Sequence, residues 1–80
     1  MQLKAIKDLV AKPISELESL EEKLMEGESL DQEIVAGSDE GEQLTHLSAA
    51  IWVLKEVEKN GSEAKTEIRN FMSRVRNSIS

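Results

Sequence analysis

A long amphipathic stretch decides the fold of this chain: residues 39–61 have the sequence DEGEQLTHLSAAIWVLKEVEKNG. Asp39 and Glu42 are typical of the start of a helix, and Asn60-Gly61 is typical of its end. The stretch therefore predicts a helix over residues 39–60, about 30 Å long at about 1.5 Å per residue. Its apolar side chains cover more than half of the helix circumference, so we expect packing on more than one side of it.

The segment that follows, residues 62–78, has the clearest amphipathic pattern in the chain. Its apolar residues lie on a single narrow face of a helix: Ala64, Ile68, Phe71, Met72, Val75 and Ile79. Ser62 is placed to cap the start of this helix. Lys65, Arg69 and Arg76 lie along one flank of the apolar face, and Arg74 lies on the other. The two helices predict a long antiparallel hairpin.

Two shorter helices are predicted in the first half of the chain. An apolar face predicts the first, over residues 2–11, and Pro13 ends it because proline cannot continue a helix. Ser15 and Glu18 have the spacing of a capping box and predict the second helix, over residues 15–26. Gly27 is placed to end that helix in a left-handed turn.

Residues 27–38 form an acidic linker, which we expect to lie on the surface with Leu30, Ile34 and Val35 turned inward. The residues leave open whether 33–36 make an extended or a helical turn. No stretch shows the alternation of a β-strand. The fold predicted is all-α, a single domain over residues 1–80 built as a small bundle of about four helices.

The chain is acidic, with a formal net charge of −6 over 80 residues, and the charge is unevenly distributed. Residues 16–42 hold one lysine against eleven acidic residues, whereas residues 61–80 hold four basic residues against two acidic ones. Polyphosphate repels an acidic chain, so nucleic acid is disfavoured as its main partner unless the basic end acts alone. We expect the acidic flank of the second helix, Glu18, Glu22 and Glu26, to neutralise the basic flank of the last helix, within one subunit or across a dimer.

The sequence contains neither a signal-peptide core nor the roughly 20 apolar residues that a membrane-spanning helix needs. We therefore expect a soluble, cytoplasmic protein without membrane association. A domain of this size buries only about 60 to 65% of the surface that its unfolded chain exposes. With no cysteine to form disulfides, oligomerisation is the expected supplement to the small core.

The residues predict no catalytic, metal or cofactor site, and we do not expect an enzyme. His46 is the only histidine, and it shares a helical face with Glu42, but two ligands do not make a metal site. We expect His46 on the surface or at an interface. The Glu18, Glu22 and Glu26 series is exposed, whereas general acid catalysis requires a desolvated carboxyl group. Residues 37–41 lack the lysine of a phosphate-binding loop.

Trp52 lies outside the apolar arc of its helix, and we expect another surface to bury its side chain. We expect a homodimer with the helix over 39–60 near its centre, because interfaces are where tryptophan most often supplies binding energy. The predicted interface residues are Trp52, Ile51, Val53, Lys65, Arg69 and Arg76. An alternative remains open, in which residues 2–11 and 30–35 cover Trp52 within one chain.

Four segments resemble a family of small bacterial proteins of unknown function, found mostly among Bacteroidetes. They are residues 39–46 (DEGEQLTH), 50–54 (AIWVL), 60–61 (NG) and 71–79 (FMSRVRNSI). The resemblance covers the second half of the chain well and the first 38 residues poorly. It implies a bacterial, cytoplasmic, compact helical protein, and it implies no mechanism.

Two classes of function remain. The first is a helical protein-interaction module that binds through an apolar groove or through the basic flank of its last helix. The second is a nucleic-acid-associated accessory protein that places Lys65, Arg69, Arg74 and Arg76 on phosphates. The shortage of aromatic residues and the negative net charge favour the first. The residues do not identify the partner.

Overall fold

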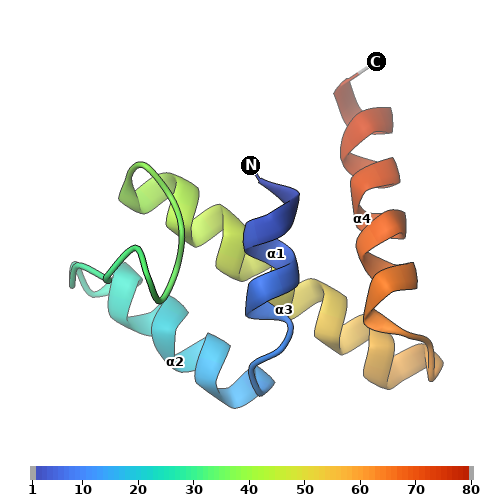
Figure 1. The fold of residues 1–80 in the computed structure, drawn as a ribbon, viewed down its shortest axis with the longest axis horizontal. Helices are drawn as coiled ribbons and strands as arrows, with labels where there is room; N and C mark the ends of the chain where they lie inside the picture. Colours follow the sequence, from blue (N-terminus) through green and yellow to red (C-terminus); the bar gives the residue numbers. More distant parts are fainter. Residues whose placement is uncertain (1, 80) are drawn as a thin grey trace.

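Four helices make up the fold in the computed structural model, which describes the backbone of residues 2–79 and the side chains of residues 2–77. They are α1 (Leu3–Leu9), α2 (Ile14–Met25), α3 (Glu40–Asn60) and α4 (Ala64–Ile79). α3 lies at the centre and contacts each of the other three (Figure 1). The described residues include no strand, so the predicted all-α class with four helices is confirmed.

The other helices are arranged around α3 in a simple order (Figure 1). α2 lies beside the first half of α3 and runs in the opposite direction, while α1 crosses in front of α3. α4 reverses the chain after α3, as the predicted hairpin requires, and its last turns lead away from α3. The packed part of this pair reaches from Ala64 to Met72. Ile79, predicted to end the apolar face, has its side chain outside the described residues.

The two ends of α3 have the capping groups that the sequence predicts. The Asp39 carboxylate accepts a hydrogen bond from the Glu42 N–H at 2.7 Å, and the Glu42 carboxylate accepts one from the Ser38 N–H at 3.0 Å. At the other end Gly61 has a φ of 64°, in the left-handed region, and its N–H donates to the Val57 carbonyl. Glycine adopts this conformation without steric cost, which is why the helix ends here.

α2 ends as predicted but begins differently. Gly27 has a φ of 91°, and the Glu28 N–H donates to the Lys23 carbonyl at 3.0 Å, which closes the helix in a Schellman motif. The predicted capping box of Ser15 is wrong, because the helix already begins at Ile14. Pro13 takes the N-cap position, where its fixed φ fits and only its carbonyl is needed.

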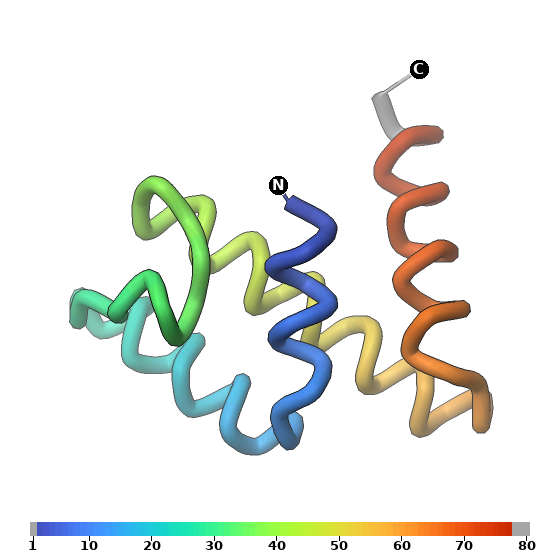
Figure 2. The backbone as a smooth tube through the Cα atoms, in the orientation of Figure 1, coloured from blue at the N-terminus to red at the C-terminus, as the bar shows by residue number. Residues whose placement is uncertain are grey.

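The linker over 27–38 contains one hydrogen-bonded turn. Of the two conformations that the sequence left open for residues 33–36, extended or helical, this turn is helical. The Asp31 carbonyl accepts hydrogen bonds from the N–H groups of Ile34 and Val35, and its carboxylate accepts one from the Glu33 N–H. Val35 is buried, as predicted, and Leu30 is partly buried, but the prediction for Ile34 is wrong because its side chain is 45% exposed. Figure 2 shows the linker passing from the end of α2 back to the start of α3.

α3 separates two apolar cores, which confirms that it is packed on more than one side. The first core lies between α3, α2 and the linker and contains Leu9, Leu17, Leu20, Leu24, Val35, Leu47, Ala50 and Ile51. The second lies between α3, α1 and α4 and contains Ile6, Ala49, Val53 and Ile68, with Trp52, Val57, Phe71 and Met72 at its edge. α1 joins the two cores, because Leu9 lies in the first and Ile6 in the second.

A polar side chain holds the linker against α3. Gln43 is buried, and its side-chain amide donates hydrogen bonds to the carbonyls of Leu30 and Val35, at 3.1 and 2.9 Å. Gly37 passes so close that a Cβ there would lie 2.7 Å from Gln43 Cγ and 2.8 Å from the Gln43 backbone nitrogen. Because a helix backbone cannot move aside, only glycine fits at position 37.

Two glycine-to-alanine substitutions should therefore change stability in opposite directions. We expect Gly37→Ala to lower the free energy of unfolding by about 1 to 3 kcal/mol, the usual cost of overpacking. Gly41→Ala should raise it by about 0.5 to 1 kcal/mol, because position 41 lies in α3 and a Cβ there makes only an ordinary contact with Asp39. Urea denaturation followed by circular dichroism measures both. Equal shifts of the same sign would contradict the close approach at Gly37.

Candidate functional site

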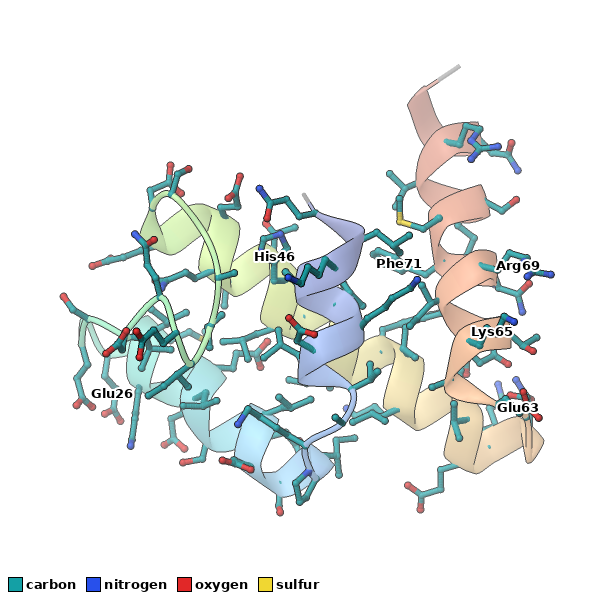
Figure 3. The ribbon with its side chains drawn as sticks, viewed as in Figure 1. Glu26, His46, Glu63, Lys65, Arg69 and Phe71 are labelled. Carbon is teal, nitrogen blue, oxygen red and sulfur yellow. The ribbon has the colours of Figure 1, made fainter. Side chains whose placement is uncertain are left out.

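The basic flank predicted on the last helix borders a groove between α4 and α1. Lys65, Arg69 and Arg76 line it from α4, and Lys7 lines it from α1. Figure 3 shows Lys65 and Arg69 extending next to each other from α4, on the side away from Phe71. All four basic side chains are exposed. The structure thus brings the three predicted basic residues together and adds a fourth.

The floor of this groove is apolar. Two adjoining hollows, of about 290 and about 310 Å³, share Lys7, Lys65 and Ile68 in their linings. Apolar side chains from both helices complete them: Leu3, Val10, Ala64 and Met72. We call the two hollows together the α1/α4 groove. Its lining, in the part of the chain whose side chains are described, combines an apolar floor with four cations and no carboxylate.

The opposite flank of α4 is fixed to α3 by a buried carboxylate. Glu67 is only 4% exposed, and its carboxylate accepts hydrogen bonds from Ser62 Oγ at 2.6 Å, Asn70 Nδ2 at 3.1 Å and Asn60 Nδ2 at 3.3 Å. Ser62 was predicted to cap α4, but its hydroxyl is used here instead, and the Glu63 carbonyl accepts the first hydrogen bonds of the helix. This network fixes the angle at which α4 leaves α3.

The hydrogen bonds also stabilise the ionised form of Glu67. Those from Ser62 and Asn70 hold the pKa of Glu67 below its ordinary value, with smaller contributions from Asn60 and the positive charge of Arg74. They outweigh burial, which acts in the opposite direction. A shallow pocket of about 380 Å³ adjoins this carboxylate. The Glu67 carboxylate thus links Asn60, at the end of α3, to Asn70 in α4. Among the described residues no buried side-chain nitrogen or oxygen lacks a hydrogen-bond partner.

Trp52 is covered from within the chain. Its ring packs on Phe71 with the centroids 5.6 Å apart and the planes tilted by 47°, and the Arg74 guanidinium lies 5.4 Å from the Trp52 centroid. These ring and cation contacts come from α4, and Trp52 also packs against the second core, to which Ile6 from residues 2–11 belongs. Trp52 stays partly exposed, and the expected dimer through α3 stays a prediction.

Two other predicted interface residues are buried inside the chain. Ile51 is 6% exposed and lies in the first core, and Val53 is fully buried in the second. Both side chains therefore offer little surface to a partner in a single chain, and their assignment to an interface stays a prediction. The apolar arc of α3 could not be divided from sequence alone into parts covered by the chain and parts left exposed. Of the predicted interface residues, Lys65, Arg69 and Arg76 are the ones that line the groove.

His46 is a buried structural residue, so its expected surface or interfacial position is wrong. Its Nε2 accepts a hydrogen bond from the Gln2 N–H at 2.9 Å, so its Nδ1 carries the proton and donates to the Ala36 carbonyl at 2.7 Å. Both ring nitrogens are thus used by the backbone. The described residues contain no cluster of three or more potential metal ligands.

The acidic flank of α2 does not meet the basic flank of α4 within one chain. The two helices lie on opposite sides of α3 (Figure 1). Figure 3 places Glu26 at one edge of the molecule and Lys65 and Arg69 at the opposite edge. The predicted neutralisation within one subunit is therefore wrong, while the version across two subunits stays a prediction.

Sequence reasoning missed Lys7 as a member of the groove. Lys7 shares a helical face with Leu3 and Val10, at i−4 and i+3, which was the available signal. That face lines a groove only when α1 lies beside α4. The position of α1 depends on the packing of Ile6 in the second core.

Fold and groove together define a small all-α protein with a basic, apolar-floored surface groove. The chain belongs to a family of unknown function, DUF6952, whose model matches residues 1–80. The family model also matches the first 38 residues, over which the sequence resemblance was poor. Searches of curated proteins and of solved structures found no match. None of the described helices is long and apolar enough to cross a membrane.

The lowered pKa of Glu67 predicts a specific pH dependence of stability. A carboxylate with a depressed folded-state pKa contributes stability above its unfolded-state value, near 4.5, and this contribution is lost as the pH falls through the folded-state pKa. Glu67→Gln should therefore destabilise the protein most at neutral pH, and the difference from the parent should shrink below about pH 4.5. Thermal melts from pH 3 to 8 measure this. Glu63→Gln, at an exposed neighbouring position, is the matched control for the loss of one carboxylate. A pH-independent loss in Glu67→Gln would contradict the assignment.

The role of His46 predicts a loss of stability on replacement by an apolar residue of similar size. His46→Leu keeps most of the volume but leaves the Ala36 carbonyl and the Gln2 N–H without their partner, so we expect a loss of about 1 to 3 kcal/mol. The exposed neighbour Thr45→Ala should change stability by no more than about 0.5 kcal/mol. Denaturation midpoints in urea decide. A His46→Leu protein as stable as the parent would show that the two hydrogen bonds are unimportant.

Proposed function

We propose that this protein is a cytoplasmic, bacterial protein-interaction module without catalytic activity, whose α1/α4 groove binds an acidic amphipathic helix. The observation that carries the proposal is the composition of the groove. Four cations surround an apolar floor with no carboxylate among its described lining residues, on a chain whose net charge is −6. Such a concentration of positive charge against the overall sign of the protein favours an anionic partner.

The apolar floor favours one kind of anionic partner, an amphipathic helix. Leu3 is 40% exposed, and Met72 is partly exposed beside it, so both would gain by being covered. An amphipathic helix places apolar residues at i, i+3 and i+4 into such a groove, and its acidic flank then meets the basic edges. The charged pairs mainly set orientation and the rate of association, while the apolar contacts supply affinity.

Nucleic acid fits this surface less well than a protein does. The four residues considered for phosphate binding are divided between two flanks of α4, because Arg74 lies over Trp52 while Lys65, Arg69 and Arg76 line the groove. The two aromatic rings, Trp52 and Phe71, pack on each other, so they do not form an open platform for stacking bases. A phosphate backbone would also gain little from an apolar floor.

Affinity capture from native cells tests the proposal with matched variants. The tagged parent and a control, Lys55→Glu with Lys59→Glu, should retain the same protein partner, because both changed residues are exposed on α3 outside the groove. Lys65→Glu with Arg69→Glu makes the same change in net charge within the groove and should reduce retention at least tenfold. Mass spectrometry with isotope labels measures the ratios.

Two results would overturn the proposed function. A partner retained equally by the parent and both variants would place its binding site outside the groove. Capture that disappears after nuclease treatment would favour the nucleic-acid alternative.

A further inference from the structure

The exposed flank of α2 has the negative charge of the helix that the groove should bind, and one exposed apolar residue beside it. Glu18, Glu22 and Glu26 follow one another at four-residue intervals, and all three are exposed. Met25 lies on the same side, within about 100° of these carboxylates at about 100° per residue, and its side chain is 74% exposed. Like charges at i, i+4 repel each other, so this flank is disfavoured unless cations oppose it.

We infer that the partner of the α1/α4 groove is a second copy of this chain, whose α2 docks with its acidic flank against the basic edges. The inference rests on the proposed function and names the partner. Glu18 and Glu22 are about 6 Å apart along their helix axis, which is also the separation of Lys65 and Arg69 along theirs. The exposed Met25 is the apolar residue that the floor around Ile68 would receive.

The arrangement of the two surfaces decides what kind of assembly forms. Glu26 and the pair Lys65 and Arg69 lie at opposite edges of the molecule (Figure 3), so a chain cannot bring its own α2 into its own groove. When one copy docks its α2 into a second, the α2 of the second copy stays free. This is a head-to-tail contact between different surfaces, which produces open chains or closed rings of copies. A closed two-fold dimer would instead use one surface twice.

The association is expected to be weak and strongly dependent on salt. Exposed ion pairs contribute little individually, and every copy carries a net charge of −6 that opposes approach. Electrostatic attraction over the groove acts across about 30 Å at 0.01 M salt but only about 3 Å at 1 M. Self-association should therefore be measurable at high protein concentration in low salt, and it should be lost in high salt.

A charge exchange between two variants tests the inference by sedimentation equilibrium at low salt. The groove variant is Lys65→Glu with Arg69→Glu, and the α2 variant is Glu18→Lys with Glu22→Lys. The parent should form species heavier than 8.9 kDa, whereas each variant alone should associate at least tenfold more weakly, because like charges then face each other. An equimolar mixture should recover the association of the parent, because each reversed surface meets its complement. The control Lys55→Glu with Lys59→Glu should behave as the parent does.

Three results would overturn the inference. The first is a parent that stays at 8.9 kDa at every concentration. The second is a mixture that associates no more strongly than the separate variants, although circular dichroism shows both to be folded. The third is association that survives both reversals and is abolished by Trp52→Ala, which would indicate a dimer through α3. Retention of another protein through the groove by a monomeric parent would leave the proposed function intact and refute only this choice of partner.

Discussion

The two-sided apolar surface of α3 is the constraint on which the rest of the structure depends. Its residues enter both cores: Leu47, Ala50 and Ile51 the first, and Ala49 and Val53 the second. Each large apolar side chain contributes roughly 1.5 to 3 kcal/mol when it is removed from water. Residues 2–79, whose backbone the structure describes, include no second helix of this length to divide the task. α2 and α4 are therefore placed on opposite sides of one helix and make their main contacts with it, not with each other.

This arrangement explains why the molecule has a groove. The Glu67 network fixes the start of α4 against the end of α3, and the last turns of α4 then lead away from it. α1 is held separately, by Ile6 in the second core and by the hydrogen bond between the Gln2 N–H and His46. Because each helix is positioned by α3, nothing requires α1 and α4 to close on each other. Leu3 and Met72 therefore stay partly exposed between them.

The features that could be predicted from the sequence are those decided by neighbouring residues. The cap at Asp39 and the glycine ends at positions 27 and 61 depend on bonds that span three to five residues, so their residue types identify them. The apolar arc of α3 likewise reveals that it is packed on two sides. The basic flank of α4 is a matter of helical periodicity, and three members of the candidate site were found in this way.

The features that could not be predicted depend on contacts between distant parts of the chain. His46 is bonded to Gln2, 44 positions away, and no local pattern distinguishes a histidine that satisfies two backbone groups from one on the surface. The burial of Glu67 was missed for a different reason: Asn60, Ser62 and Asn70 lie only three to seven positions from it, but they meet its carboxylate only once the turn between α3 and α4 has formed. Trp52 was assigned to an interface because the sequence did not specify how α4 is rotated about its axis. That rotation places Phe71 of α4 against the Trp52 ring.

The separation of charge across the molecule follows from the same central helix. α3 keeps the acidic α2 and the basic flank of α4 on opposite sides, so the attraction between them cannot be satisfied inside one chain. A chain with a net charge of −6 would lower its electrostatic energy most simply by scattering its cations among its carboxylates. Instead, Lys7, Lys65, Arg69 and Arg76 converge on one groove that lacks a carboxylate in its described lining. No carboxylate among the described lining residues offsets their mutual repulsion, and an acidic surface from outside the chain would offset it.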